Sequence, residues 1–381
     1  MKAALSTTKF KLISFPKFSK AQNKDFTLIL NERVNQYFSE NQLSKKGGKA
    51  MALKSFVMLS LFIVPLIIIS LGILTQTWQL FVLYLLCGAG MAGIGMGVMH
   101  DAIHGSYSSN QKLNWLMAQS MNLVGANASV WRVQHNVLHH TYTNIEGSDD
   151  DLNTPPFLRF TPKRILSAVH KYQHFYTWFF YSLSTISWIT TKDFVRLKRY
   201  TDKGLIKQGR EFKLMLFKLI AWKLAYYGYA LVLPILFSGF TWPTVVVAFI
   251  CMHIVTGMTI SLVFQTAHIM PETNFPSPCK QGNIDCNWTV HQLETTTNYA
   301  PDNKVLGWLV GGLNYQVEHH LFPHICHLHY PEISKIVKRT TEEFGLTYNS
   351  IPTFSRALSE HARMLRHLGQ QNTLQFAHSE L

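Results

Sequence analysis

Charged residues are scarce in this chain and are missing altogether from two long stretches. They make up 15% of the 381 residues, whereas a typical soluble domain carries about a quarter. No Lys, Arg, Asp or Glu occurs from Ser55 to His100 or from Leu224 to Pro271. Each stretch is just over twice the roughly 20 residues that a membrane-spanning helix needs. The sequence therefore predicts an all-α integral membrane protein with two helical hairpins. The four expected spans cover residues 55–75, 78–99, 214–237 and 242–265.

Acidic residues are few as well, 21 against 35 Lys and Arg, which gives a formal net charge of +14. The basic residues gather before Ser55 and between Lys192 and Lys213, and the two hairpin turns have none. The positive-inside rule then places both termini and the central loop in the cytoplasm. Because this topology explains the charge and no nucleic-acid-binding motif accompanies it, we expect membrane lipid and no nucleic acid as a partner. The run from Lys192 to Lys213 is also a candidate docking site for an acidic partner protein.

Neither cysteine pairing nor secretion is indicated. Apart from a loose Cys279/Cys286 pair, the five cysteines lack the spacing of a metal site, and in the cytoplasm they are expected to be reduced. The first apolar run begins too late and is too long for a signal peptide.

The helical pattern at Phe26–Phe38 is expected on the membrane surface, and the aromatic segment His174–Ile189 is expected at headgroup depth. The expected organisation is a basic cytoplasmic segment (1–54), a main domain (55–345) and a cytoplasmic tail (346–381).

Histidines are clustered just outside the uncharged stretches, near the expected edge of the membrane. Three clusters occur, and the topology above puts all of them on one side: His100-Asp-Ala-Ile-His104, His135-Asn-Val-Leu-His139-His140 and Gln316-Val-Glu-His319-His320. Imidazole is the commonest metal-binding side chain. Residues four apart on an α-helix lie about 40° apart, so the first two histidines of each of the first two clusters should share a face. Adjacent residues diverge by about 100°, so each adjacent pair should be split between two metal ions.

Further candidate residues lie close to the three clusters. His268 ends the second hairpin as His100 ends the first, so it is expected as an additional ligand. Asp101, Gln316 and His327 are expected to support ligands through hydrogen bonds or a bound water. Five more residues are candidates for orienting ligands or a substrate headgroup, with helix capping as the alternative: Trp131, Arg132, Asn144, Asp149 and Asp150.

The number of histidines bears on the metal. A zinc site is satisfied by three or four protein ligands, whereas eight imidazoles suit two ions, and iron adds redox chemistry. The spacing alone leaves copper and manganese as alternative metals.

The string from His100 to His104 is similar to the zinc-protease motif His-Glu-x-x-His. Asp101 stands where that motif has Glu, however, and a protease would leave the other clusters without a role.

At these residues the chain resembles the membrane fatty acid desaturases, which carry three histidine boxes in this order and with this hairpin spacing. Gln316, where many relatives have histidine, resembles the front-end branch, and the closest likeness is to delta-6 (linoleoyl-type) desaturases of bacteria and cyanobacteria. The matching segments run through much of the chain: Trp131–Asn144, Asp149–Leu152, Gly311–Pro323 and Ile325–Pro331.

The resemblance implies four spans and a cytoplasmic helical cap that carries a histidine-rich di-iron site. It implies iron at the seven box histidines and at His268, while direct ligation by Gln316 does not follow. The chain has no His-Pro-Gly-Gly haem motif, so a separate donor of the ferredoxin or cytochrome b5 type is expected. The implied ligands are His100, His104, His135, His139, His140, His268, His319 and His320.

The expected activity is O₂-dependent insertion of a cis double bond into an acyl lipid or acyl-CoA, on the carboxyl side of an existing double bond. One alternative is a hydroxylase, epoxygenase or ketolase on the same di-iron scaffold, which would share the histidine boxes. Another is a non-catalytic lipid-binding or transport protein with a structural metal. Product analysis separates the first alternative, and O₂ consumption separates the second.

Overall fold

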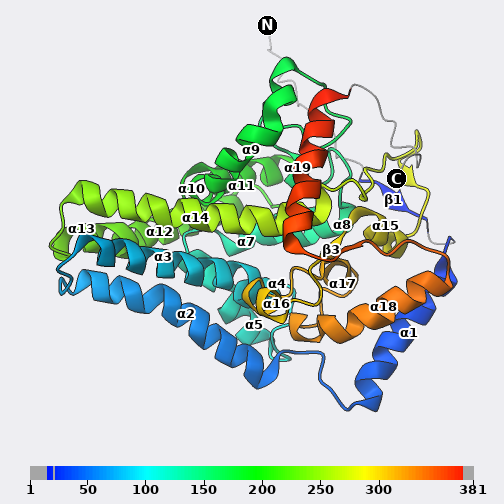
Figure 1. Ribbon diagram of the computed structural model, residues 1–381, viewed down its shortest axis with the longest axis horizontal. Coiled ribbons are helices and arrows are strands. Elements are labelled where there is room, and N and C mark those ends of the chain that lie inside the picture. Colours follow the sequence, from blue (N-terminus) through cyan, green and yellow to red (C-terminus); the bar gives the residue numbers. More distant parts are fainter. Residues whose placement is uncertain (1–14, 20–21, 372–381) are drawn as a thin grey trace, which may run out of the picture.

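The computed structural model describes residues 15–19 and 22–371, and helices dominate it (Figure 1). Four helices are long and apolar enough to cross a membrane, which confirms the two predicted hairpins. They lie side by side in one half of the molecule (Figure 1), and the protein is an integral membrane protein. The spans are α2 (Gly48–Ser70), α3 (Thr77–Gly93) continued to Ile103, α12 (Arg210–Tyr227) continued to Phe237, and α14 (Trp242–His268).

The first and third spans begin earlier than predicted, at Gly48 and Arg210. Their first turns carry lysines that interrupt the uncharged pattern without ending the helix. Lys54 is buried within the protein, where its Nζ lies 3.0 Å from Nε2 of His327. The predicted spans start after the buried Lys54 and after the exposed Lys213, and so miss the first turns of both helices.

The two spans of the first hairpin pack unusually closely. A Cβ added to Gly90 of α3 would lie 2.5 Å from the backbone nitrogen of Phe62 in α2, so only glycine permits this approach. Small residues such as glycine let helices approach closely in lipid. Near its end the same span contains a π-helical turn, Ile94–Val98, before it continues as α4 (Met99–Ile103). The third span likewise passes through a π-helical turn, Gly228–Val232, into α13 (Leu233–Phe237).

Shorter helices form a cap at the other end of the spans (Figure 1). Within the described residues the strands are limited to two short parallel pairs, β1 (Lys17–Phe18) with β2 (Asn283–Ile284) and β3 (Asn298–Tyr299) with β4 (Ser350–Ile351). The remaining helices are α1 (Lys24–Glu40), α5 (Gln111–Ala118), α6 (Ser120–Leu123), α7 (Ala128–Arg132), α8 (His140–Tyr142), α9 (Gln173–Ser182), α10 (Ser184–Ser187), α11 (Asp193–Asp202), α15 (Trp288–Thr295), α16 (Lys304–Leu309), α17 (Gln316–Leu321), α18 (Tyr330–Glu343) and α19 (Phe354–Gln370), with π-helical turns at Val133–His139 and Trp188–Lys192 and 3₁₀ turns at Asp150–Leu152, Ala168–Tyr172 and His327–His329.

Helix α1 forms where the apolar pattern predicts it, but its placement on the membrane surface is wrong. Its apolar face is buried in a cluster that includes Ile333 and Val337 of α18. The buried side chains of that face are Phe26, Leu30, Val34 and Phe38. The cap offers these side chains a protein surface to cover, so the helix packs there.

The aromatic segment forms α9 and α10, which run along α14 and do not make a fifth span. A Cβ added to Gly257 of α14 would lie 2.5 Å from the carbonyl oxygen of Ser182, so the two elements are in direct contact. Phe175 and Phe179 remain exposed on α9, in keeping with a position at headgroup depth. Helix α19 buries its apolar face against α9 and α14, so both α1 and α19 pack against the main domain.

Candidate metal centre

Five separate elements bring the eight predicted histidines together at the inner end of the spans. His100 lies on α4 and His104 directly follows it, and His268 is the last residue of α14. The π-helical turn Val133–His139 and the start of α8 carry the second box, and α17 carries the third. His104 is partly buried and the other seven are buried.

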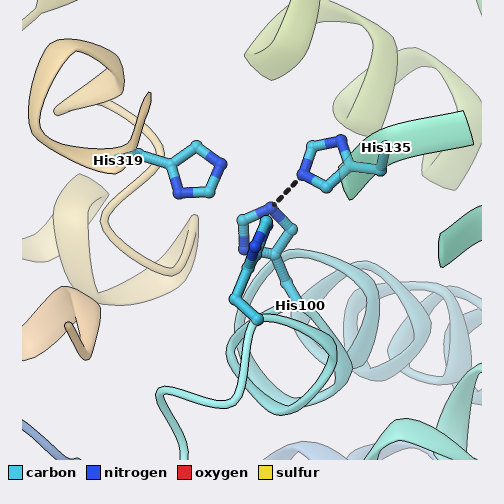
Figure 2. Close-up of side chains that lie close together, drawn as sticks. His100, His135 and His319 are labelled. Atoms are coloured by element: carbon cyan, nitrogen blue, oxygen red, sulfur yellow. Dashed lines mark hydrogen bonds between the residues drawn. The ribbon is translucent and has the colours of Figure 1, made fainter. Parts of the chain in front are cut away.

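The ε nitrogens of the first group point at one another. Figure 2 shows His100, His135 and His319 converging from three elements, with Nε2 of His100 2.9 Å from Nε2 of His135. One candidate ligand atom from each of His100, His104, His135 and His319 lies within 4.8 Å of the others. A second group of the same tightness consists of His139, His268 and His320. The structure thus brings seven of the eight candidates into two adjoining groups.

Adjacent histidines divide between the groups as predicted. His319 belongs to the first group and His320 to the second. His139 is in the second, whereas Nε2 of His140 lies 2.9 Å from Nε2 of His319 and 3.2 Å from Nε2 of His135. His140 also groups with His319 and His320, so it stands at the boundary.

The predicted shared faces are confirmed for both pairs. His100 and His104 lie in the same group, and the rings of His135 and His139 are stacked with their centroids 5.5 Å apart, although their ligand atoms belong to different groups. The backbone of residues 133–139 is π-helical where an α-helix was expected, and residues four apart still lie on one face of such a turn. Sequence spacing carries no marker for this turn.

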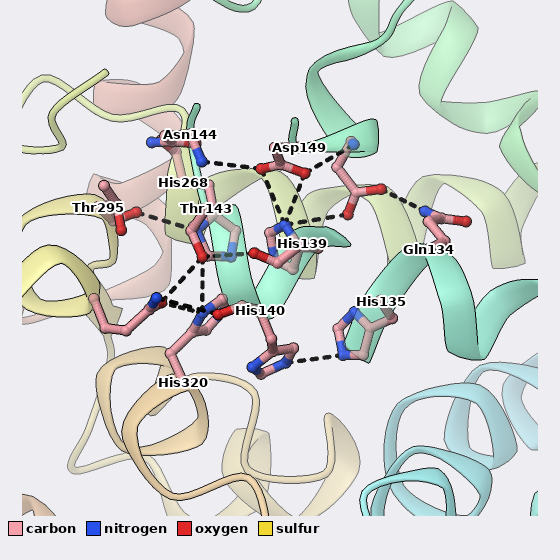
Figure 3. A network of polar contacts seen from close by, with 12 residues as sticks. Gln134, His135, His139, His140, Thr143, Asn144, Asp149, His268, Thr295 and His320 are labelled. Carbon is pink, nitrogen blue, oxygen red and sulfur yellow. Dashed lines mark hydrogen bonds and ion pairs between the residues drawn. The ribbon is translucent and has the colours of Figure 1, made fainter. Parts of the chain in front are cut away.

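The second group is oriented through the other ring nitrogen (Figure 3). Nδ1 of His139 lies 3.2 Å from both carboxylate oxygens of Asp149, and Nδ1 of His268 lies 3.2 Å from the carbonyl oxygen of Thr295. Nδ1 of His320 lies 2.8 Å from Oε1 of Gln292. Acceptors at Nδ1 select the tautomer in which Nε2 keeps its lone pair, as metal ligation requires.

The free nitrogens test whether the site fits a metal. In the part of the chain that the structure describes, Nε2 of His104, His268 and His320 is buried without a hydrogen-bond partner. Buried polar atoms are normally paired, and three orphaned lone pairs aimed into one region match a missing metal ligand sphere. The donor set of neutral imidazoles suits iron, copper or zinc.

The surroundings of the first group favour neutral histidine rings, whereas those of the second group favour a positive charge at His139. Burial lowers the pKa of His104, His135 and His319 well below the usual value, so these rings are neutral at pH 7. Burial opposes the charge of His139 too, but the carboxylate of Asp149 outweighs it and raises the pKa of His139 to about 9. The same carboxylate would stabilise a metal ion at His139 in place of the proton.

Asp149 and Asn144 lie at the metal centre. Asp149 accepts hydrogen bonds from the backbone nitrogens of Asn144 and Asp151, both at 2.9 Å. The Asn144 amide donates to the carbonyl oxygen of His268 at 2.9 Å, and its φ of 58° turns the chain there. Asp149 therefore contacts the His139 ring and also caps the 3₁₀ turn Asp150–Leu152, so both suggested kinds of contact occur for it, whereas Asn144 contacts the backbone of His268.

The other headgroup candidates lie in three different surroundings. Trp131 stacks on the His135 ring, with centroids 4.2 Å apart and an angle of 20° between planes. Asp150 is paired with Arg196 at 3.0 Å and Arg199 at 2.8 Å. Arg132 is exposed. Arg196 and Arg199, which belong to the basic run proposed for docking, therefore share a buried carboxylate partner.

Asp101 and His327 form a buried chain on the far side of α4. Oδ2 of Asp101 lies 2.8 Å from Nδ1 of His327, whose Nε2 faces Lys54. The contacts among Asp101, His327 and Lys54 fix α4, and they do not include a predicted ligand.

Gln316 interacts with His268, and its amide nitrogen is buried without a partner among the described residues.

Sequence reasoning missed the residues that α15 supplies. Gln292 and Thr295 hold His320 and His268, and the hydroxyl of Thr143 donates to Oε1 of Gln292 at 3.0 Å. Helix α15 lies between the fourth span and the third box and contains no cluster of its own, apart from the unassigned His291. No pattern in the sequence marks these three residues.

A cavity of about 520 Å³ opens beside the first group and is lined by His135 and Trp131. Its outer part is polar, with Asp150, Asp151 and Lys192 among its walls. Inward it adjoins a narrow apolar pocket between the spans, and the two share four lining residues: Trp131, Trp188, Ile260 and Phe264. The succession leads from a larger space with charged walls to a narrow apolar pocket of about 40 Å³.

Comparison with known proteins agrees with the geometry. The model of the fatty acid desaturase family matches residues 76–352. The sn-1 linoleoyl-lipid 6-desaturase of Synechocystis sp. is 34% identical over 354 residues, covering 92% of this chain and 97% of the relative. The enzyme of the same name from Arthrospira platensis is 32% identical, covering 90% and 92% of the two chains. The acyl-lipid (8-3)-desaturase of Physcomitrium patens is 33% identical, covering 92% and 73%. The chain belongs to the fatty acid desaturase family.

Proposed function

We propose that this desaturase holds two iron ions at its eight converging histidines and inserts a cis double bond into the acyl chain of a membrane lipid. The new bond lies on the carboxyl side of an existing one. The observation that carries the proposal is the pair of imidazole groups beside a cavity with a polar mouth and an apolar end. The activity for which the Synechocystis and Arthrospira relatives are named, linoleoyl-lipid 6-desaturation, supports the front-end position and the lipid carrier.

The two groups provide the two iron sites. His100, His104, His135 and His319 hold one ion, with His140 completing it, and a smaller set holds the other: His139, His268 and His320. Gln316 sits where an additional ligand would complete the second set, and its amide is suited to hold a bound water. Bound iron supplies the redox chemistry with O₂.

The overall reaction balances as one –CH₂–CH₂– unit, O₂, two electrons and two protons giving –CH=CH– and two molecules of water. The protein positions the reactants for it. Asp149 and Gln292 fix the rings of His139 and His320. Trp131, stacked on His135, and Phe264 close the cavity wall next to the first group and exclude water from the methylenes.

Electrons come from a separate donor of the ferredoxin or cytochrome b5 type on the cytoplasmic side. Because Arg196 and Arg199 are paired with Asp150, docking by the basic run falls to its exposed members, among them Lys207 and Lys213. Reversing the charge of these two lysines should lower donor-dependent turnover and its sensitivity to salt.

Expression in a host fed with linoleate tests the proposal. Mass spectrometry of the fatty acids should locate a new double bond between the existing one and the carboxyl group, in lipid-bound acyl chains. A new bond toward the methyl end would refute the front-end position, and a hydroxylated or keto product would refute desaturation. Purified enzyme that accepts linoleoyl-CoA and not linoleoyl lipid would overturn the lipid carrier.

A further inference from the structure

A buried ion pair lies next to the apolar end of the cavity and is not part of the metal centre. Lys223 belongs to α12 in the third span, and its side chain is 7% exposed, against 1% for that of Asp193 at the start of α11. Their charged atoms are 3.0 Å apart. Ionisable groups within membrane spans are costly, and they usually mark a functional site. A purely structural link between these helices would not need a charge.

The Lys223 ammonium joins two walls of the apolar pocket. Besides Asp193, it donates hydrogen bonds to the carbonyl oxygen of Gly125 at 3.1 Å and to that of Trp188 at 2.6 Å. The neighbours of Gly125, Val124 and Ala126, line the apolar pocket on one side. Trp188 itself lines it on the other side, together with Ile189. Three contacts of one ammonium group thus connect two segments far apart in the sequence.

The walls are packed tightly where they meet. A Cβ added to Gly125, whose φ is +83°, would lie 2.8 Å from Cδ1 of Tyr226 and 2.9 Å from Cγ2 of Ile189. The Tyr226 hydroxyl lies 2.8 Å from Nε2 of His253, and the backbone oxygen of His253 accepts from Thr185, another lining residue. The pocket is therefore closed on this side by side chains that polar contacts hold in place.

We propose that Lys223 and Asp193 are positioning residues that fix how deep the methyl end of an acyl chain enters the cavity, and so select chain length. The proposal rests on the proposed function, since it assumes an acyl chain that passes His135 and ends in the apolar pocket. Methylene groups offer nothing to hydrogen-bond, so the stop at the end of the pocket sets which methylenes face the metal centre. Without the ammonium the two walls separate and longer chains enter.

The test compares Lys223→Met with Lys218→Met, a matched change on the exposed side of the same helix. Cells expressing each variant receive a mixture of unsaturated fatty acids that differ in length by two carbons. The ratio of products, per amount of enzyme in the membrane, should shift about tenfold toward longer chains in Lys223→Met, because a methylene in an apolar pocket is worth about tenfold or more in specificity. Lys218→Met should keep the wild-type ratio.

A double variant, Lys223→Met with Asp193→Asn, guards against loss of the fold, since it leaves no unpaired buried charge. Thermal stabilisation of the purified, iron-loaded protein by acyl chains of each length gives a second readout that needs no turnover. Wild type should be stabilised most by its preferred length, and the variants by longer chains. An unchanged length preference in both readouts would show that the ion pair only anchors the helices. Wild type that binds acyl chains selectively but forms no desaturated product would refute the proposed function and leave this proposal standing.

Discussion

At the scale of single residues, the metal centre depends on groups that orient imidazoles as much as on the imidazoles. The box histidines could be identified from the sequence because each box contains several candidate ligands within a few residues. Their hydrogen-bond acceptors were not, because Gln292 and the Thr295 carbonyl come from a separate helix and carry no local pattern. Asp149 was identified as a candidate, but its role was not, since a carboxylate near a turn can equally cap a helix.

Replacing Asp149 with Asn should weaken metal binding by about 10- to 100-fold, the usual effect of losing a partner that orients a ligand. The amide removes the negative charge that faces Nδ1 of His139 while keeping the size of the side chain. Iron retained against increasing chelator measures the effect. Asp202→Asn, in an exposed ion pair with Lys198, is the control, and equal iron retention in the two variants would contradict this role.

At the scale of elements, the spans follow from the missing charge, whereas local departures from the α-helix do not. The uncharged stretches predicted two hairpins because a membrane span must be apolar over its whole length. The π-helical turn Val133–His139 was missed because it depends on how the surrounding elements pull the backbone. Helix α1 was predicted as an element but misplaced, since an apolar face does not say whether lipid or protein covers it.

Deleting Val137, an exposed residue inside the π-helical turn, should let the segment relax to an α-helix. His139 would then be the third residue after His135 on an α-helix, about 60° from it around the axis, so that its ligand atom would leave the second group. Iron content should fall to about one ion per chain, with activity lost. Val137→Ala keeps the chain length and should retain both ions; full iron content in the deletion variant would show that the turn does not set the geometry.

Leu30→Ala should lower the stability of the protein by about 2–5 kcal/mol, because Leu30 is buried between α1 and the cap. Leu28, on the same helix and 56% exposed, should tolerate the same change with almost no effect. Thermal unfolding in detergent compares the two variants. Similar losses at both positions would mean that α1 is not held by its buried face.

At the scale of the whole molecule, the second and fourth spans and the segment between the two hairpins enclose an apolar pocket, and the cap closes over the histidines. Because the number of spans is even, we expect both ends of the chain and every histidine box on one side of the membrane. The sequence allowed this arrangement to be predicted because the boxes follow the ends of the hairpins. The cavity that connects the polar mouth with the apolar pocket was not predictable, since its walls come from segments of the chain without a common pattern.

Reporter tags at both termini should be accessible from the cytoplasm, and a tag in the turn at Ser238–Pro243 only from the opposite side. The expectation follows from the even number of spans and from the Lys/Arg asymmetry. A terminus found on the same side as the turn would separate the histidine boxes and contradict a shared metal centre.

The metal content of purified, active enzyme tests the central claim most directly. Two imidazole groups with separate ligand sets should bind two ions, so elemental analysis should give about two irons per chain, and His139→Ala and His320→Ala should each lose iron and all product while remaining in the membrane. Fully active protein that contains zinc alone, or a single metal ion per chain, would contradict the di-iron centre.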